Sequence, residues 1–314
     1  MKYRAFGRLG WQVSEIGCGM WGMGDWKDSD DSESLRAMQR AVDLGSNFFD
    51  AAWSYGNGRS EALLGQLVRD NPGAKIYTAT KIPAKNQGGR SLDDCYPPDH
   101  IEQYVKKSLA NAKLERFDLV QFHTWDDAWA GDERWARKLE DLRVRGLVGG
   151  VGASLKRWQP WNGVQAVKSG RIDSVQVIYN VFDQNPEDEL FPACAEHGVA
   201  VIARVPLDEG TLTGTLTLES RWPDGDWRGT YFTPEHLKES VRRAEALRTL
   251  VPAGTSMAQM ALRFVLAEPA VATTIPGMRK AHHAEDNTAA SDQGPLPKVL
   301  LRELKKHRWD RRRA

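Results

Sequence analysis

Residues 47–65 read NFFDAAWSYGNGRSEALLG, and this stretch decides how the rest of the chain is interpreted. Its apolar opening predicts a short strand that ends near Asp50, and its glycines predict a loop after that strand. Ser60 and the acidic Glu61 are typical of the first turn of a helix. The stretch is therefore a strand, a polar loop that carries Tyr55, and a helix. It sets polar side chains at the carboxyl end of a strand.

The same order of strand and helix recurs along the whole chain. Strands that alternate with helices are typical of a parallel sheet. Eight such units in 314 residues favour an α/β fold of the closed (β/α)8 barrel type over an open sheet. The expected strands are Ile16–Gly19, Phe48–Ala51, Lys75–Ile82, Asp118–His123, Val148–Ser154, Ser174–Tyr179, Val199–Val205 and Val271–Ile275.

Helical periodicity follows each strand, and further elements extend the barrel. A hairpin of Tyr3–Phe6 and Gln12–Ile16 is expected to plug the bottom, and Pro297–His307 to add a closing helix. Residues 207–233 predict a long loop, and no linker divides residues 1–314, which are expected to form one domain. The other expected helices are Ser32–Leu44, Ser60–Arg69, Pro98–Ala112, Glu133–Arg145, Trp158–Ser169, Pro186–His197, Pro234–Leu250, Ser256–Leu266 and Lys280–Ala290.

Composition narrows the class of protein. The chain has 43 lysines and arginines against 42 aspartates and glutamates, which argues against nucleic acid or an anionic membrane as the main partner. Its three cysteines are widely spaced and form neither a disulfide framework nor a metal-binding motif, which suits a reducing cytoplasm. No apolar run is long enough to cross a bilayer, and the polar start lacks a signal core. We expect a cytoplasmic protein without a metal, with the basic residues Arg308 and Arg311–Arg313 in a solvated chain end.

Four polar residues fall at the ends of neighbouring predicted strands, where barrel chemistry takes place. Asp50 and Tyr55 follow the second strand, and Lys81 and His123 end the third and fourth. An ammonium near a phenol stabilises the phenolate, which makes the phenol a better proton donor. Asp50 would hold Lys81 in place and keep it charged, and His123 would orient the substrate or donate to its oxygen. Protonation of an oxygen fits carbonyl reduction, and acid catalysis of this kind contributes about 10²- to 10⁴-fold.

Each of these residues also has a purely structural interpretation. A tyrosine near a strand end usually packs, Asp50 and Lys81 could form one ion pair that closes the barrel, and a histidine on an apolar strand is usually a satisfied core residue. Taken singly, each residue favours the structural interpretation. Their joint position at consecutive strand ends favours the catalytic one.

The chain also resembles the aldo-keto reductase family over nearly its whole length. Each shared motif is weak alone, but together they are highly specific. The motifs are Asp50-Ala-Ala-Trp-Ser-Tyr55-Gly56 with Gly58-Arg-Ser60-Glu61, Lys81 in TATKI, Asp118-Leu-Val-Gln121-Phe-His123, Gly152-Ala-Ser154, Gln176, Pro206-Leu207, Leu212-Thr213-Gly214, and Ile275-Pro276-Gly277 with Asn287.

The resemblance implies a (β/α)8 barrel that binds NADPH and reduces an aldehyde or ketone, a sugar or another small carbonyl compound among them. It implies that Asp50, Tyr55, Lys81 and His123 form the catalytic tetrad. Hydride would come from the nicotinamide and the proton from Tyr55. The implied cofactor contacts are Ser154 and Gln176 at the carboxamide, Arg204 at the nicotinamide wall, Pro206 and Leu207 in the pyrophosphate loop, and Gly277, Arg279, Lys280, His283 and Asn287 at the adenosine end.

Cofactor choice depends on residues that partly depart from the family pattern. Arg279 and Lys280 open a predicted helix and could meet a 2′-phosphate, which favours NADPH over NADH. Leu155 replaces an asparagine found in many members, Arg204 replaces an aromatic ring, and His283 replaces an arginine. Because a planar guanidinium can also stack on a ring, we expect nicotinamide binding in an altered form.

Tryptophan is frequent, with 12 in the chain, and several follow predicted strands. We expect Trp21, Trp53 and Trp125 to wall an aromatic pocket for the carbonyl substrate. The alternative is that half of these tryptophans simply pack against the protein. Further candidates for the same pocket are Trp26, Trp129 and Trp309.

Two other functions remain open from the sequence. One is a non-catalytic NADPH-binding barrel that senses redox state or serves as a subunit of an assembly. The other uses Lys81 as a Schiff-base nucleophile, as barrel aldolases do. The oligomeric state has no signature in the sequence.

Overall fold

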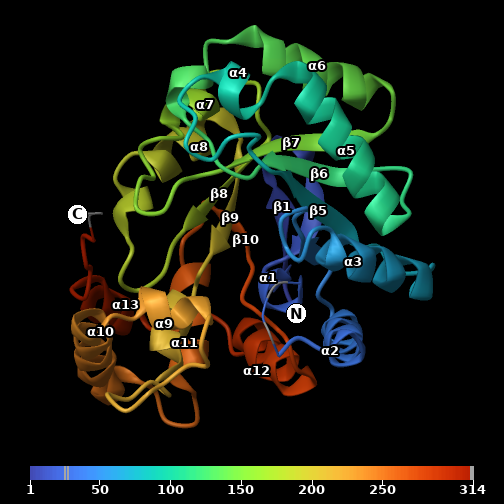
Figure 1. Ribbon diagram of the computed structural model, residues 1–314. Helices are drawn as coiled ribbons and strands as arrows, with labels where there is room; N and C mark the ends of the chain where they lie inside the picture. The colour runs from blue at the N-terminus through green and yellow to red at the C-terminus, as the bar shows by residue number, and fades with distance from the viewer. Residues whose placement is uncertain (25, 27, 312–314) are drawn as a thin grey trace.

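A computed structural model describes residues 1–24, 26 and 28–311 and contains an eight-stranded parallel sheet (Figure 1). The first and last strands meet through the bridges Ile16–Thr274 and Gly19–Gly277, which close the sheet into a barrel. The expected (β/α)8 fold is therefore confirmed. In sheet order, the strands are β3 (Cys18–Gly19), β4 (Phe48–Asp50), β5 (Tyr77–Ile82), β6 (Phe117–Phe122), β7 (Val148–Ser154), β8 (Ser174–Ile178), β9 (Ala200–Arg204) and β10 (Val271–Thr274).

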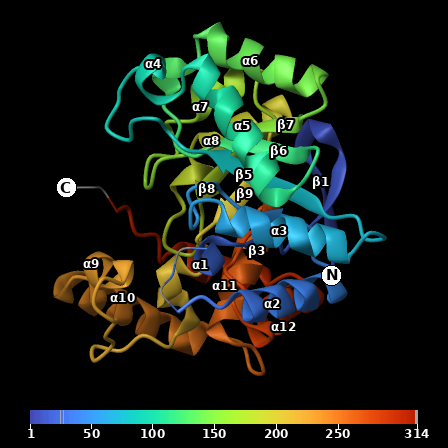
Figure 2. The ribbon, with the colours of Figure 1, turned by 45° about the vertical axis from the view of Figure 1, so that its right-hand side comes forward.

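Helices surround the strands on all sides (Figures 1 and 2). The helices are α1 (Trp21–Gly24), α2 (Asp31–Asp43), α3 (Arg59–Asp70), α4 (Leu92–Cys95), α5 (Pro98–Ala112), α6 (Glu133–Val144), α7 (Val164–Lys168), α8 (Leu190–His197), α9 (Trp227–Tyr231), α10 (Pro234–Leu247), α11 (Met257–Leu266), α12 (Ala281–Asp292) and α13 (Lys298–Lys305). The longer helices α2, α3, α5, α6 and α11 bury apolar residues that belong to the main hydrophobic core around the barrel.

The N-terminal hairpin closes the bottom of the barrel, as expected. Its strands β1 (Tyr3–Phe6) and β2 (Trp11–Ser14) pair antiparallel around the turn Gly7–Leu9. Within that turn, the backbone N–H of Arg8 donates to Gly198 O at 2.7 Å, and its guanidinium bonds Asp173. These contacts tie the hairpin to the amino-terminal ends of the strands.

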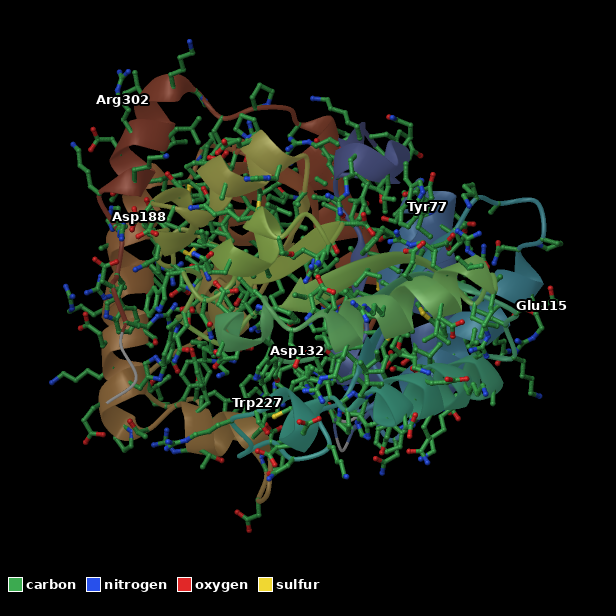
Figure 3. The ribbon with its side chains drawn as sticks, turned by 90° about the horizontal axis from the view of Figure 1, so that it is seen from above. Tyr77, Glu115, Asp132, Asp188, Trp227 and Arg302 are labelled. Atoms are coloured by element: carbon green, nitrogen blue, oxygen red, sulfur yellow. The ribbon has the colours of Figure 1, made fainter. Side chains whose placement is uncertain are left out.

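The barrel interior changes character along each strand. Near the hairpin, the inward side chains are apolar, and Phe6 stacks on Phe48 while Trp11 stacks on Tyr77. Figure 3 shows Tyr77 beside the hairpin and Trp227 at the opposite edge of the molecule. Because side chains alternate along a strand, the inward positions beyond this apolar layer belong to the mouth. They are occupied by Asp50, Lys81, Gln121, Gln176 and Arg204.

Several expected elements differ from the structure. The helix expected over Pro186–His197 begins only at Leu190, after a short turn at Asn185–Glu187. The helix expected over Trp158–Ser169 begins only at Val164, and Trp158 takes a left-handed backbone with φ +58°. The expected loop at residues 207–233 contains the short helix α9. The short helices α1 and α4 lie in segments for which the sequence predicted no element.

The expectation of a solvated basic end was wrong for Arg311, which is buried, whereas Arg308 stays partly exposed in surface ion pairs. Arg308 forms two hydrogen bonds to Asp188, at 2.7 and 2.6 Å. Arg311 is buried and pairs with Asp183 and Asp208, which lie after β8 and β9. Arg312 and Arg313 lie outside the described residues. Among the residues that the structure describes, no helix is both long and apolar enough to span a membrane.

Candidate active site

Lys81 is the centre of a buried polar cluster at the mouth of the barrel. Its Nζ lies 2.5 Å from Asp50 Oδ2, 2.9 Å from Ala51 O and 3.2 Å from the hydroxyl of Tyr55. The parallel pairing of β4 with β5 brings the two strand ends together, since Asp50 aligns with Ala79. The structure thus brings together three of the four residues predicted from strand ends.

Asp50 is fixed by side chains from two further strands. Its Oδ1 accepts hydrogen bonds from Gln121 Nε2 at 3.0 Å and from Gln176 Nε2 at 2.9 Å. Both carboxylate oxygens therefore have buried donors, which satisfies the charge in the barrel interior. Gln121 was not predicted as a site residue, although it occupies an inward position two residues before His123.

The charge of Lys81 is maintained by its partners. Burial alone would lower the pKa of this lysine, but the carboxylate of Asp50 and the hydroxyl of Tyr55 together raise the pKa above its ordinary value. The ammonium is 1% exposed, so water does not compete for its hydrogen bonds. A permanent cation therefore lies within hydrogen-bond distance of the tyrosine oxygen.

His123 completes the set from the end of β6. Its ring lies 5.6 Å from the ring of Tyr55, centroid to centroid, and nearly perpendicular to it at 85°. Burial and the nearby cations Lys81 and Arg204 lower the pKa of His123 to about 3. The imidazole is therefore neutral near pH 7 and can act as a hydrogen-bond donor or acceptor without carrying charge.

The loop that carries Tyr55 is held by close backbone contacts. A Cβ atom at Gly24 would lie 2.5 Å from the carbonyl oxygen of Tyr55, and Gly56 takes a left-handed φ of +67°. Gly58 has φ +96° and lies against Asn111. The glycines of the opening sequence motif are thus required by the backbone geometry that presents the tyrosine.

The opposite side of the mouth carries Ser154, Gln176 and Arg204, at the ends of β7, β8 and β9. Arg204 Nη2 donates to the carbonyl oxygen of Leu155 at 3.0 Å. Its Nε is buried and has no acceptor among the described residues. These three side chains lie near one another, since β7, β8 and β9 are neighbours in the sheet.

The segment after β9 has an unusual backbone. Val205, Asp208 and Glu209 all have positive φ, at 54°, 47° and 55°. A left-handed conformation is strained for a β-branched residue such as Val205. Pro206 and Leu207 lie within this strained segment, and such strain clusters at functional sites.

The start of α12 holds the other predicted cofactor residues. Arg279 pairs with Asp28 at 2.9 Å, and its guanidinium lies 4.8 Å from the ring of Trp26. Lys280 is exposed at the N-cap of α12, and His283 is half-buried in the first turn. Nearby, Asn287 Nδ2 donates to Gly277 O at 3.3 Å. The start of α12 is basic, although Arg279 already has a carboxylate partner.

Comparison with known proteins agrees with this geometry. The model of the Aldo/keto reductase family matches residues 15–308. The chain belongs to the aldo-keto reductase family. It is therefore an oxidoreductase that uses a nicotinamide cofactor and acts on carbonyl compounds.

Individual relatives cover nearly the whole reductase. The oxidoreductase YqkF of Bacillus subtilis (strain 168) is 29% identical over 315 residues, covering 98% of this chain and 96% of the relative. A probable voltage-gated potassium channel subunit beta of Oryza sativa subsp. japonica is 27% identical over 321 residues, covering 96% and 94%. The holo form of the aldo-keto reductase AKR11C1 from Bacillus halodurans has a TM-score of 0.78 and 25% identity, covering 99% and 97%.

In this aldo-keto reductase, three tryptophans meet across the mouth. The ring centroids of Trp21 in α1 and Trp227 in α9 lie 4.7 Å apart, and the ring centroid of Trp26 lies 5.9 Å from each of them. The indole Nε1 atoms of Trp26 and Trp227 are buried without an acceptor among the described residues. The loop after β3 and the loop after β9 are thereby joined through aromatic contacts.

The remaining tryptophans occupy different surroundings. Trp125 is fully buried among Phe122, Trp129 and Trp135, and its indole donates to Asp127 at 2.9 Å. It therefore packs in the core and offers no surface to a ligand, and Trp129 is nearly as buried. In contrast, Trp53 is half-buried beside the tetrad loop and packs on Tyr104, and Trp309 packs on Phe182.

Proposed function

We propose that the protein reduces an aldehyde or ketone with NADPH and that Tyr55 is the proton donor. The observation that carries the proposal is the buried ammonium of Lys81, held between Asp50 Oδ2 and the Tyr55 hydroxyl. When bound, the nicotinamide supplies a hydride to the carbonyl carbon. Every other step is assigned to side chains of the barrel mouth.

The tetrad handles the proton at the carbonyl oxygen. Tyr55 donates its hydroxyl proton to that oxygen, and the phenolate left behind is stabilised by Lys81. Asp50 keeps the lysine positioned and charged through the 2.5 Å contact. The neutral His123 lies across the Tyr55 ring and orients the substrate oxygen toward the hydroxyl.

Unpaired donors around the mouth support a cofactor that is rich in acceptors. Arg204 Nε and the indole nitrogens of Trp26 and Trp227 are buried without partners in the described part of the chain. A buried donor without an acceptor costs free energy, which phosphate and carboxamide oxygens would recover. Ser154, Gln176, Pro206 and Leu207 would line the same site, together with Gly277, His283 and Asn287 at its far end.

We assign NADPH rather than NADH from the basic residues at the start of α12. Arg279 and Lys280 lie at the start of α12, where free backbone N–H groups also favour a phosphate. A 2′-phosphate would compete with Asp28 for the Arg279 guanidinium. For the substrate, Trp21 and the half-buried Trp53 are the proposed aromatic walls, and small or medium carbonyl compounds are the proposed class.

The test combines cofactor binding with a carbonyl screen. NADPH and NADH are titrated separately by tryptophan fluorescence, and each complex is then offered a panel of aldehydes and ketones. We expect tighter binding of NADPH and turnover that disappears in Tyr55→Phe. Cofactor binding without any turnover would favour the rival function of a non-catalytic subunit; two relatives are named as probable voltage-gated potassium channel subunits beta. Borohydride trapping of a substrate on Lys81 would favour an aldolase instead.

A further inference from the structure

The C-terminal tail after α13 packs against the loop that follows β8. The backbone N–H of Trp309 donates to Phe182 O at 2.7 Å, and Arg308 pairs with Asp188 at 2.6 Å. Two residues after Trp309, Arg311 turns into the protein and is only 9% exposed. The last residues of a chain are usually solvated unless something ties them down, so the burial of Arg311 indicates a specific contact.

The guanidinium of Arg311 joins two carboxylates that come from different loops. Its Nε donates to Asp183 Oδ1 at 3.2 Å, and its Nη2 donates both to Asp183 Oδ2 and, at 2.7 Å, to Asp208 Oδ1. Asp183 follows β8 and Asp208 follows β9, and both are at most 5% exposed. The second oxygen of Asp208, Oδ2, is buried without a donor among the described residues. The neutralisation of the Asp208 charge therefore depends on Arg311.

Asp208 lies in the segment that the proposed function assigns to the pyrophosphate of the cofactor. Three residues between positions 205 and 209 have positive φ, and successive backbone N–H groups in a turn can form a concavity for an anion. Farther along the same segment, the Thr211 hydroxyl is buried without a partner in the described part of the chain, and a hydroxyl can donate to a phosphate oxygen. The side chains of Asp208 and Glu209, however, are acidic and would repel a pyrophosphate if they were unpaired.

Arginines neutralise both of these acidic side chains. Arg157 lies 2.5 Å from Glu209, and Arg311 pairs with Asp208. Three guanidiniums and three carboxylates lie near one another, so the group is neutral as a whole. Its members are Arg157, Arg204, Arg311, Asp183, Asp208 and Glu209. Loss of Arg311 alone would give the group a net negative charge, and salt would screen that charge poorly because both aspartates are buried.

We propose that Arg311 controls the affinity for the cofactor from the C-terminal tail, because it neutralises Asp208 and so lets the segment after β9 accept a pyrophosphate. The inference rests on the proposed function, which supplies the ligand that carries the phosphates. The hydrogen bonds of Arg311 go to Asp183, Asp208 and the Tyr231 hydroxyl, none of which belongs to the tetrad. Arg311 is therefore a positioning residue that acts through Asp208. Its loss should weaken the binding of the pyrophosphate and leave the binding of the adenosine end at α12 unchanged.

The test measures dissociation constants at pH 8 for NADPH and for adenosine 2′-phosphate, which lacks the pyrophosphate. Burial raises the pKa of Asp183 to about 6, so this carboxylate is ionised at pH 8. Arg311→Met should weaken NADPH binding roughly fivefold or more, the effect of one unit charge about 4 Å from another in water. Binding of adenosine 2′-phosphate should stay within about twofold of wild type. Arg308→Met, the matched control from the same tail, removes the partner of Asp188 and should leave both constants unchanged.

Removal of the Asp208 carboxylate should reverse the loss. Asp208→Asn keeps the shape of the side chain, and its new amide nitrogen can replace Oδ2, which has no donor among the described residues. Combined with Arg311→Met, it should restore the affinity for NADPH to within about twofold of wild type, because the two residues act as a pair. Alone, Asp208→Asn should bind NADPH at least as tightly as wild type does, since one carboxylate fewer repels the phosphates.

Three results would overturn the inference. The first is an affinity of Arg311→Met for NADPH within about twofold of wild type, and the second is a double variant that binds as weakly as Arg311→Met. The third is weaker NADPH binding by Asp208→Asn alone, a result that does not depend on how Arg311→Met folds. In all three cases the wild-type protein still binds NADPH, so the proposed function survives. Failure of the wild-type protein to bind NADPH would overturn the proposed function and this inference together.

Discussion

The bottom and the mouth of the barrel are built from the same strands but have opposite chemistry. On β4, inward Phe48 lies in the apolar plug and Asp50, two residues later, lies in the polar cluster. On β5, Tyr77 stacks on the hairpin, while Lys81 binds both Asp50 and Tyr55. On each strand, the residue that packs in the apolar plug and the residue that belongs to the proposed active site are only two or four positions apart. Changes at each end should therefore have separable effects.

The largest expected effect is on turnover at the mouth. Tyr55→Phe removes the proposed proton donor and should lower kcat by about 10²- to 10⁴-fold, the usual contribution of a positioned acid. Single-turnover oxidation of NADPH in the presence of an aldehyde measures the rate. The matched control is Tyr77→Phe, which removes a hydroxyl from the apolar plug and should leave kcat unchanged. An equal loss of kcat in Tyr55→Phe and Tyr77→Phe would contradict the proposal that catalysis is confined to the mouth of the barrel.

The second effect is on stability at the bottom. Phe6 is fully buried and stacks on Phe48 and Trp11, so Phe6→Ala should lower the free energy of unfolding by about 3–5 kcal/mol. Urea denaturation measures this loss. We expect kcat per folded molecule to stay within about twofold of wild type, because the tetrad lies at the other end of the barrel. The more conservative Phe6→Leu should cost clearly less than Phe6→Ala.

A third prediction concerns pH. The pKa of His123 falls from 6.5 to about 3 on folding, so between these values the unfolded chain binds a proton that the folded protein does not. The contribution of the neutral His123 to the free energy of unfolding is fully present above pH 6.5 and is lost as the pH falls toward 3. At pH 5 the loss amounts to at most about 2 kcal/mol.

Urea denaturation at pH 7 and pH 5 tests this difference. The stability of His123→Gln should fall less over this range than that of wild type, whereas a control change at the exposed His282 should have little effect. An unchanged pH dependence in His123→Gln would show that the histidine is not held neutral by its surroundings.

The smallest effect is expected at the adenosine end. The Asp28 carboxylate competes with a phosphate for Arg279, so Asp28→Asn should strengthen NADPH binding by roughly two- to fivefold, the size of one exposed ion pair. NADH binding, which involves no 2′-phosphate, should not change. The control is Asp31→Asn, whose carboxylate pairs with Arg59. Equal gains for NADPH and NADH would mean that Arg279 does not bind the phosphate.

Local sequence patterns predicted most of the barrel. The helix over Pro98–Ala112 and the strand over Val148–Ser154 match the structure residue for residue, because periodicity, an opening proline and glycine-rich alternation are all local signals. The grouping of Asp50, Tyr55, Lys81 and His123 at the mouth was predictable for the same reason. Each of its residues lies at or just after the end of a strand, and parallel pairing brings those ends together.

The remaining features depend on contacts between distant segments. Arg311 pairs with Asp183 and Asp208, more than a hundred residues away, and no local pattern marks it as buried. The contact between Trp21 and Trp227 also joins two separate loops. Trp125 follows a strand as a pocket residue would, but the burial that makes it a core residue arises from α6 and the short turn at Asp127–Trp129.

The central claim is that the buried cluster around Lys81 is the active site of a carbonyl reductase. The most direct measurement supplies the protein with an aldehyde and with NADPH deuterated at both C4 positions, and determines the mass of the alcohol formed. The account predicts one deuterium at the carbinol carbon with wild type and almost no alcohol with Tyr55→Phe. Binding of NADPH without any deuterated alcohol from a broad aldehyde and ketone panel would contradict it.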